Sequence, residues 1–181
     1  MGKLRVVQYI NQFFAQVGGE DKADYPMEYH EGPMGPGLAF QQAFGDQAEI
    51  IGTIVCGDSY FGENTDKVKP EILKKVAELK PDLFIAGPAF NAGRYGFACA
   101  TIAVAVQDEL HIPVVTGMYV ENPGADEAKS KVYIVSTKNS AAGMRDAVKK
   151  MAPLGLKIAR GEKIGSSKEE GYIPQGIRVN F

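Results

Sequence analysis

The sequence predicts an α/β protein in which helices cover both faces of a mainly parallel sheet of five strands. Five short apolar segments, each the length of one buried strand, alternate with segments of helical spacing. These segments are apolar at nearly every position, which is typical of parallel strands that are buried on both faces. The alternation predicts a three-layer α/β/α sandwich of the flavodoxin-like or Rossmann-like type.

The first strand is expected at residues 4–10. Residues 15–35 follow with no helical or strand spacing, because glycine and proline interrupt every pattern. A connection this long is usually functional or mobile. Residues 36–44 predict a short helix, since Pro36 suits a first helical turn.

The second strand is predicted at residues 49–55, a nearly continuous apolar run. A helix that begins at Thr65 or Asp66 follows it, with apolar residues on one face. The third strand is the run at residues 83–86, which we expect Gly87 and Pro88 to end.

The helix after the third strand is expected at residues 92–110. It is apolar nearly all round, which indicates burial in the core or against a partner. Strands at 112–116 and 132–135 complete the sheet.

The last helix begins at Asn139 or Ser140 and keeps helical spacing as far as Met151. Pro153 should break or kink it. Residues 1–161 are then one α/β domain. The Gly-, Ser- and Glu-rich residues 162–181 are predicted to be an extended tail, a linker or a docking strand.

Composition excludes several classes of protein. Twenty Lys and Arg against 22 Asp and Glu residues give a net charge of −2, and the basic residues are scattered. This predicts no nucleic-acid partner and no attraction to anionic membranes. We expect no membrane span and no signal peptide. The only two cysteines, Cys56 and Cys99, lie far apart in apolar segments, so the prediction is a cytoplasmic protein with reduced thiols.

The turn after the third strand is the first candidate site. Asn91, Gly93, Arg94 and Tyr95 lie where a strand ends and a helix begins. Unpaired helix N–H groups, the helix dipole and the Arg94 charge make this a candidate receptor for a carboxylate or phosphate. The alternative is that the glycines of this stretch only permit close packing of helix and strand.

Two acidic residues, Asp58 and Glu121, also follow predicted strand ends. The fold would bring them to the same edge of the sheet as Arg94. Charges of both signs on one edge suit a small zwitterion, although solvated loop charges explain the spacing equally well.

Other familiar chemistry is not indicated. Cys56 stands at a strand end, where a redox thiol could lie, but a lone cysteine is more often a small buried hydrophobe. Two histidines with no third ligand nearby predict no metal site. The sequence has no phosphate-loop, dinucleotide-binding or nucleophile-elbow motif.

Six motif groups are spread along the chain: VQYINQFF at 7–14 with GGE at 18–20, VCGD at 55–58, AGPAFNAGRYG at 86–96, TGMY at 116–119 with ENPG at 121–124, SAAGMR at 140–145, and EGYIP at 170–174 with GIR at 176–178. Together they resemble one known family, the selenoprotein subunit of glycine/sarcosine/betaine reductase component B. The resemblance covers essentially the whole chain, and the motif at 86–96 is the most specific.

The resemblance implies part of an anaerobic reductase complex, and hence an oligomer. In that complex component B binds glycine, sarcosine or betaine, and the C–N bond is cleaved reductively to release the amine. The carboxymethyl group then passes to a selenocysteine of component A and leaves as acetyl phosphate through component C. A pyruvoyl group belongs to a separate partner subunit.

The chain also departs from the family. The family's subunit is longer, and its own redox centre, a selenocysteine two residues away from a Cys, lies in its second half. These 181 residues contain neither a selenocysteine nor a Cys-x-x-Cys pair. We therefore expect a split, truncated or free-standing relative that needs no cofactor of its own and binds substrate without turning it over alone. The alternative is a scaffold or docking module, with the 97–106 helix and residues 162–181 as its interaction surfaces.

Overall fold

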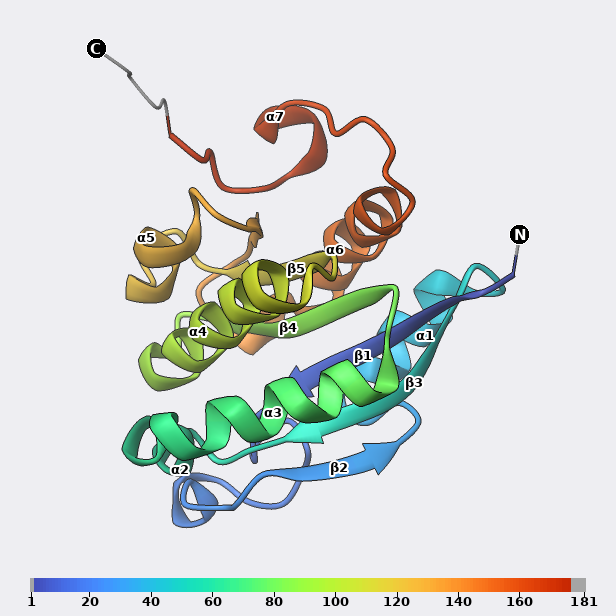
Figure 1. Ribbon diagram of the computed structural model, residues 1–181. Coiled ribbons are helices and arrows are strands. Elements are labelled where there is room, and N and C mark those ends of the chain that lie inside the picture. The colour runs from blue at the N-terminus through green and yellow to red at the C-terminus, as the bar shows by residue number, and fades with distance from the viewer. Residues whose placement is uncertain (1, 177–181) are drawn as a thin grey trace.

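The computed structural model describes residues 2–176 and has one twisted sheet with helices on both faces (Figure 1). The described strands are β1 (Leu4–Ile10), β2 (Glu28–Glu31), β3 (Ala48–Val55), β4 (Leu83–Phe90), β5 (Val114–Met118) and β6 (Tyr133–Ser136). They lie in the order β2-β3-β1-β4-β5-β6. All neighbours are parallel except β2, which runs antiparallel to β3 at one edge.

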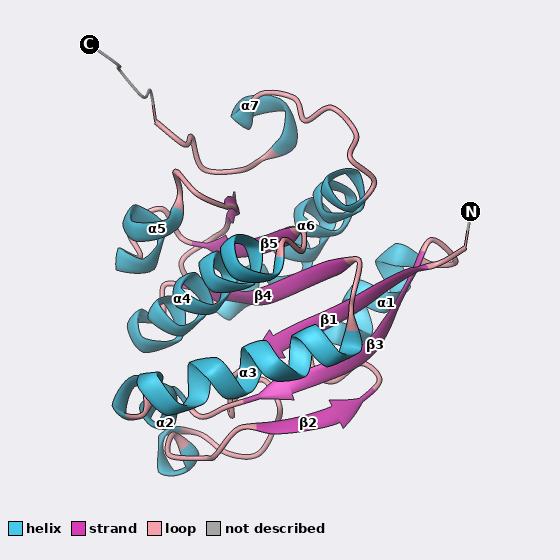
Figure 2. Ribbon diagram, viewed as in Figure 1, coloured by secondary structure: helices cyan, strands magenta, loops and turns pink. Residues whose placement is uncertain are grey.

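The helices form the outer layers. They are η1 (Glu20–Lys22), α1 (Gly37–Phe44), α2 (Asp58–Glu63), α3 (Thr65–Leu79), α4 (Gly93–Leu110), α5 (Pro123–Ala128), η2 (Ala141–Gly143), α6 (Met144–Ala159) and α7 (Ser167–Glu170). Helices α3 and α4 cover one face of the sheet, and α1 and α6 cover the other (Figure 2). The predicted three-layer α/β sandwich is therefore confirmed.

The core consists of two apolar layers, one on each side of the sheet. Side chains that alternate along β1 divide between them: Val7 and Tyr9 face α3 and α4, whereas Val6 faces α1 and α6. Helix α4 is buried by its own domain, with Ile102 and Val106 both fully covered. Its apolar surface is thus explained by burial in the core.

The strand order fixes where a ligand can bind. From β1 the chain passes to β2 and β3 on one side and then returns to β4 on the other side. The connections that leave the C-terminal ends of β1 and β4 therefore diverge, and a crevice opens between them. Doubly wound sheets bind ligands in this crevice.

The sheet has one strand more than the sequence predicted. Residues 15–35 were expected to lack strands, yet Glu28–Glu31 pair with Gly52–Val55 along the edge of the sheet. The four residues of β2 show no apolar alternation because none of them is fully buried. Their position is set by pairing with β3, which a local pattern does not reveal.

Two elements continue where the sequence predicted an end or a break. Strand β4 continues past Gly87 and Pro88 to Phe90, with an irregular register. Its pairing with β1 ends at Ala86, so the N–H that Pro88 lacks removes no hydrogen bond from that ladder. Helix α6 also continues through Pro153. The carbonyl that Pro153 leaves unpaired belongs to Lys149, an exposed residue that water can reach.

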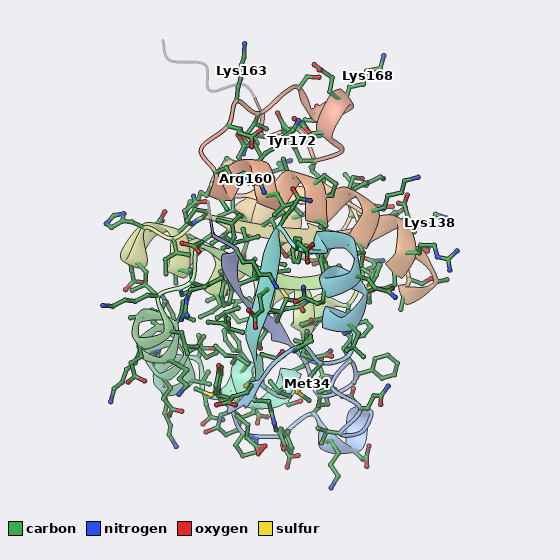
Figure 3. The ribbon with its side chains drawn as sticks, turned by 90° about the vertical axis from the view of Figure 1, so that its right-hand side faces the viewer. Met34, Lys138, Arg160, Lys163, Lys168 and Tyr172 are labelled. Atoms are coloured by element: carbon green, nitrogen blue, oxygen red, sulfur yellow. The ribbon has the colours of Figure 1, made fainter. Side chains whose placement is uncertain are left out.

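The C-terminal segment returns to the sheet. Tyr172 forms an isolated antiparallel bridge with Val135, and its ring packs on Tyr133 at 4.9 Å between centroids. Figure 3 shows Lys163 and Lys168 pointing outward from this segment, which also carries Tyr172. The role of residues 162–181 as a linker stays a prediction, and the last five of them, with the Ile177–Arg178 part of one motif, lie outside the described residues.

Candidate functional site

A cleft of about 300 Å³ opens at the C-terminal edge of the sheet, between the ends of β1, β3 and β4. Its position is the crevice that the strand order creates. The lining residues are Asn11, Gln12, Phe13, Phe14, Gly19, Glu20, Asp58, Ala89, Phe90, Asn91, Ala92, Tyr95, Asn139, Ser140 and Ala141. This lining contains two carboxylates and, among the described residues, no Lys or Arg.

Asp58 is the buried carboxylate of the cleft, with only 7% of its surface exposed. Asn11 donates a 3.0 Å hydrogen bond from Nδ2 to Asp58 Oδ2, and the Asp58 backbone N–H donates to Gln12 Oε1 at 3.1 Å. The other carboxylate oxygen, Oδ1, is buried and has no hydrogen-bond partner within the part of the chain that the structure describes. Burial raises the pKa of Asp58, while the hydrogen bond from Asn11 and the nearby Arg94 charge oppose this shift.

Aromatic rings form a second wall. The ring of Phe14 packs on Tyr95 at 5.8 Å between centroids and on Phe90 at 6.3 Å. Tyr95 is completely buried, and its hydroxyl oxygen also lacks a hydrogen-bond partner among the described residues. Burial raises the pKa of Tyr95 well above its usual value. The cleft therefore places two unpartnered buried oxygens, Asp58 Oδ1 and Tyr95 Oη, against an apolar wall.

The turn at Phe90–Ala92 is held by a residue that sequence reasoning missed. Asn122 is fully buried and donates from Nδ2 to the carbonyl oxygens of Phe90 at 2.9 Å and Ala92 at 3.2 Å. Its Oδ1 accepts the Gly124 N–H and so caps α5. Gly96 permits this contact, because a Cβ there would lie 2.2 Å from Asn122 Oδ1. At Gly96, close packing is the role that the structure shows.

The remaining predicted site residues are divided between the cleft and its surroundings. Asn91 lines the cleft with Asp58 and Tyr95, whereas Gly93 and Arg94 lie beside it at the start of α4. Arg94 is half exposed and forms an ion pair with Glu20, and it also donates to Ser59 Oγ. Glu121 is exposed and is not a lining residue.

Cys56 is fully buried, and its Sγ lies 3.7 Å from the carbonyl oxygen of Gly57. Burial raises the pKa of the Cys56 thiol to about 12, so almost no reactive thiolate exists at neutral pH. Cys99 is also buried, within α4.

Sequence reasoning also missed Asn11, Gln12 and the residues 139–141 that line the cleft. The signal for Asn11 and Gln12 was present, because they directly follow β1 just as Asp58 follows β3. Residues 139–141 were interpreted as a helix start, and residues 140 and 141 also as part of a family motif, but not as cleft residues.

Neither a metal site nor a membrane span is visible in the described residues. No group of three or more His, Cys, Asp or Glu side chains within residues 2–176 could hold a metal ion. Over the same range, every helix is too short or too polar to cross a bilayer.

The family model and the curated relatives that match this chain point to the same family. The model of the family described as glycine/sarcosine/betaine reductase selenoprotein B matches residues 3–181. The chain is 55% identical over its whole length to the sarcosine reductase complex component B subunit beta of Peptoclostridium acidaminophilum, of which it covers 42%. It is also 55% identical to the glycine reductase complex component B subunit gamma of Carboxydothermus hydrogenoformans, again covering 42% of that protein.

A betaine reductase complex component B subunit beta from Peptoclostridium acidaminophilum is 43% identical over 96% of this chain. The chain covers 40% of that protein. The chain thus spans about two-fifths of the length of the curated relatives it matches. No solved structure shows significant similarity to it.

Proposed function

We propose that this chain, which belongs to the glycine/sarcosine/betaine reductase selenoprotein B family, is the substrate-binding portion of a reductase component B. It would bind a small zwitterionic amino acid or betaine and present it for reductive cleavage of its C–N bond. The observation that carries this proposal is the 300 Å³ cleft at the switch point of the sheet, with a buried carboxylate and an aromatic wall.

The names of the relatives support a ligand of this kind. They refer to sarcosine, glycine and betaine reductase complexes. These three compounds share an aminoacetate skeleton and differ only in how many methyl groups the nitrogen carries. A cleft of this volume suits such a ligand, since small-molecule pockets begin at about 300 Å³.

The chain would bind and orient the ligand, and the redox chemistry would come from elsewhere. A selenocysteine in the part of the subunit beyond this chain and a pyruvoyl group on a partner subunit belong to this proposal. So do component A and component C as partners, and an oligomeric assembly. The buried thiols of Cys56 and Cys99 are not placed for such chemistry.

The ligand carboxylate would be received by Arg94 and Asn91 at the start of α4. Arg94 now pairs with Glu20, which lines the cleft from the 3-10 helix η1. For Arg94 to bind a carboxylate in a bidentate manner, Glu20 must release it. The exposed position of this ion pair makes the exchange inexpensive.

Calorimetric titration of the chain with glycine, sarcosine and betaine tests the proposal. Binding of at least one of the three, and no binding of an uncharged analogue such as acetamide, is the expected result. The absence of heat for all three at millimolar concentrations would exclude a substrate-binding role for this chain.

The second candidate, a scaffold or docking module, has less structural support. Most of the apolar surface of α4 is already buried against the sheet and its neighbouring helices. Ile173 in the C-terminal segment is likewise 4% exposed and packs into the core. Exposed Phe97 and Val120 are the observation in its favour. Pull-down of the other reductase subunits by a chain that binds none of the three compounds would support it.

A further inference from the structure

We infer that the cleft binds the ligand's nitrogen as an ammonium group that carries N–H bonds, with Asp58 Oδ1 and Tyr95 Oη as its acceptors. This inference rests on the proposed function and deepens it, because it names the orientation of the ligand and the class of amine. The carboxylate end of the ligand then faces outward, toward Asn91 and Arg94.

The first argument is the charge of the lining. Glu20 and Asp58 are its two carboxylates, and the described lining has no basic residue. Arg94 lies outside the lining and pairs with Glu20, and no described residue forms an ion pair with Asp58. A carboxylate in a cleft that lacks lining cations favours a cationic group.

The second argument is hydrogen bonding. Asp58 is only 7% exposed, and its Oδ2 already accepts a hydrogen bond from Asn11. A buried acceptor without a donor is destabilising, so Oδ1 requires a donor. Among the described residues, Tyr95 Oη has no hydrogen-bond partner either, so it is not bonded to Asp58. An ammonium group with N–H bonds supplies the donor that Asp58 Oδ1 lacks and can also donate to the Tyr95 oxygen, whereas a quaternary nitrogen has no N–H to donate to either.

The third argument is the way Asp58 is held. Asn11 and Gln12 fix the residue from the end of β1 through its side chain and its backbone N–H. Asn11 Oδ1 also accepts the Phe14 N–H at 3.0 Å, so the same side chain sets the loop that carries the aromatic wall. Asn11 is therefore a positioning residue, and the two walls of the cleft share one support.

Access to the two oxygens requires a side chain to move. Both atoms are closed to solvent. Phe14 packs on the Tyr95 ring and is only partly buried, and its neighbour Phe13 is 58% exposed. The Phe13–Phe14 turn is the exposed part of this wall, so it is the segment that we expect to shift when an ammonium group enters.

The test is a titration of the ¹⁵N-labelled 181-residue chain with methylammonium, tetramethylammonium and acetate, followed by amide shifts. Methylammonium should shift residues 11–14, Asp58 and Tyr95, and should bind roughly tenfold tighter than tetramethylammonium, which cannot donate. Asp58→Asn should weaken methylammonium binding by about tenfold or more and leave acetate binding unchanged, because only the cation loses a charged acceptor. Tyr95→Phe should weaken it less. Asp46→Asn, an exposed carboxylate at the opposite edge of the sheet, is the matched control and should change nothing.

Each outcome separates this inference from the proposed function. If methylammonium binds at these residues but glycine, sarcosine and betaine do not, the ammonium subsite stands and the proposed function fails. If glycine binds wild type and Asp58→Asn with equal affinity, the subsite is wrong and the proposed function stands. If methylammonium shifts no amide signal in the wild-type chain, the two oxygens are assigned to buried water and the inference is overturned. This result does not depend on whether the variants fold.

Discussion

Asn122 donates a hydrogen bond to the carbonyl oxygen of Phe90, 32 residues earlier, and so joins the turn before α5 to the end of β4. Phe90 has a φ of 52°, in the left-handed region that bulky residues rarely adopt. The Tyr119 N–H donates to the same carbonyl. The geometry of the cleft wall at Phe90 therefore depends on contacts from the next crossover of the sheet.

Asn122→Ala should be strongly destabilising. The substitution removes the cap of α5 and leaves two carbonyl oxygens without their side-chain donor, for a loss of about 2–4 kcal/mol in free energy of unfolding. Urea denaturation measures this loss. Asn139→Ala, at an exposed position, is the control and should cost little. A loss below about 1 kcal/mol would mean that Phe90 is held by the backbone contact alone.

Asp58→Asn should stabilise the chain at neutral pH relative to wild type, and the advantage should shrink as the pH falls. Burial raises the pKa of Asp58 in the folded state, with the Glu20 charge adding to the shift and Asn11, Gln12 and Arg94 opposing it. A raised pKa means that this carboxyl contributes stability only while protonated, and the contribution is lost as the pH rises through its folded-state pKa. Urea denaturation from pH 4 to pH 8 measures the difference. Destabilisation by Asp58→Asn at pH 7 would show that the ionised carboxylate is structural.

Cys56 should resist alkylation in the folded chain. Its raised pKa of about 12 and its complete burial leave almost no thiolate at neutral pH. Iodoacetamide labelling followed by mass spectrometry should show no adduct in buffer and two adducts in urea, and Cys56→Ala should cost about 1 kcal/mol of stability. If Cys56 is labelled rapidly in buffer and glycine suppresses that labelling, Cys56 would again be a candidate redox thiol.

Arg94 and Glu20 should act in opposite directions on zwitterion affinity. Arg94→Lys keeps the charge but loses the planar donor pair, and Arg94→Ala should cost about 1–2 kcal/mol of binding for this half-exposed side chain. Glu20→Gln frees Arg94 and should raise the affinity roughly two- to fivefold. Calorimetry with glycine measures both, with exposed Arg145→Lys as the control. Unchanged affinity in all variants would mean that Arg94 does not bind the ligand and serves only in its ion pair with Glu20.

The isolated chain should release no amine from glycine, sarcosine or betaine in the presence of a dithiol. It has two cysteines, both buried, and no pair that could cycle between thiol and disulfide. An assay for ammonia or methylamine measures this directly. Turnover by the purified chain would contradict the division between binding and redox chemistry.

The sequence predicted those features that depend on local pattern. Apolar runs identified five of the six strands, and the Gly93–Leu110 helix was placed within one residue. Asp58 was predicted to lie at this edge of the sheet because a polar residue after a buried strand is visible in the sequence, and it lines the cleft. Its partner Asn11 follows β1 in the same way, and the two side chains meet because β1 and β3 are neighbours.

Features that depend on distant partners could not be predicted. Strand β2 exists because β3 offers an edge, and its residues Glu28 and Glu31 carry no apolar signal. The local sequence around Asn122 predicts a loop, and nothing near it indicates a contact with Phe90. The ion pair of Arg94 with Glu20 joins residues 74 positions apart, so the sequence suggested a free guanidinium.

The segment that brings Glu20 into the cleft is joined to the first turn of α2. The Ala23 carbonyl oxygen accepts the N–H groups of Ser59 and Tyr60 at 2.8 and 3.0 Å. Gly57 leaves no room between the two segments, because a Cβ there would lie 2.3 Å from the same oxygen. The segment that carries Glu20 and the helix start that carries Asp58 are therefore packed as one unit, so a displacement of either one changes the spacing between the two carboxylates of the cleft.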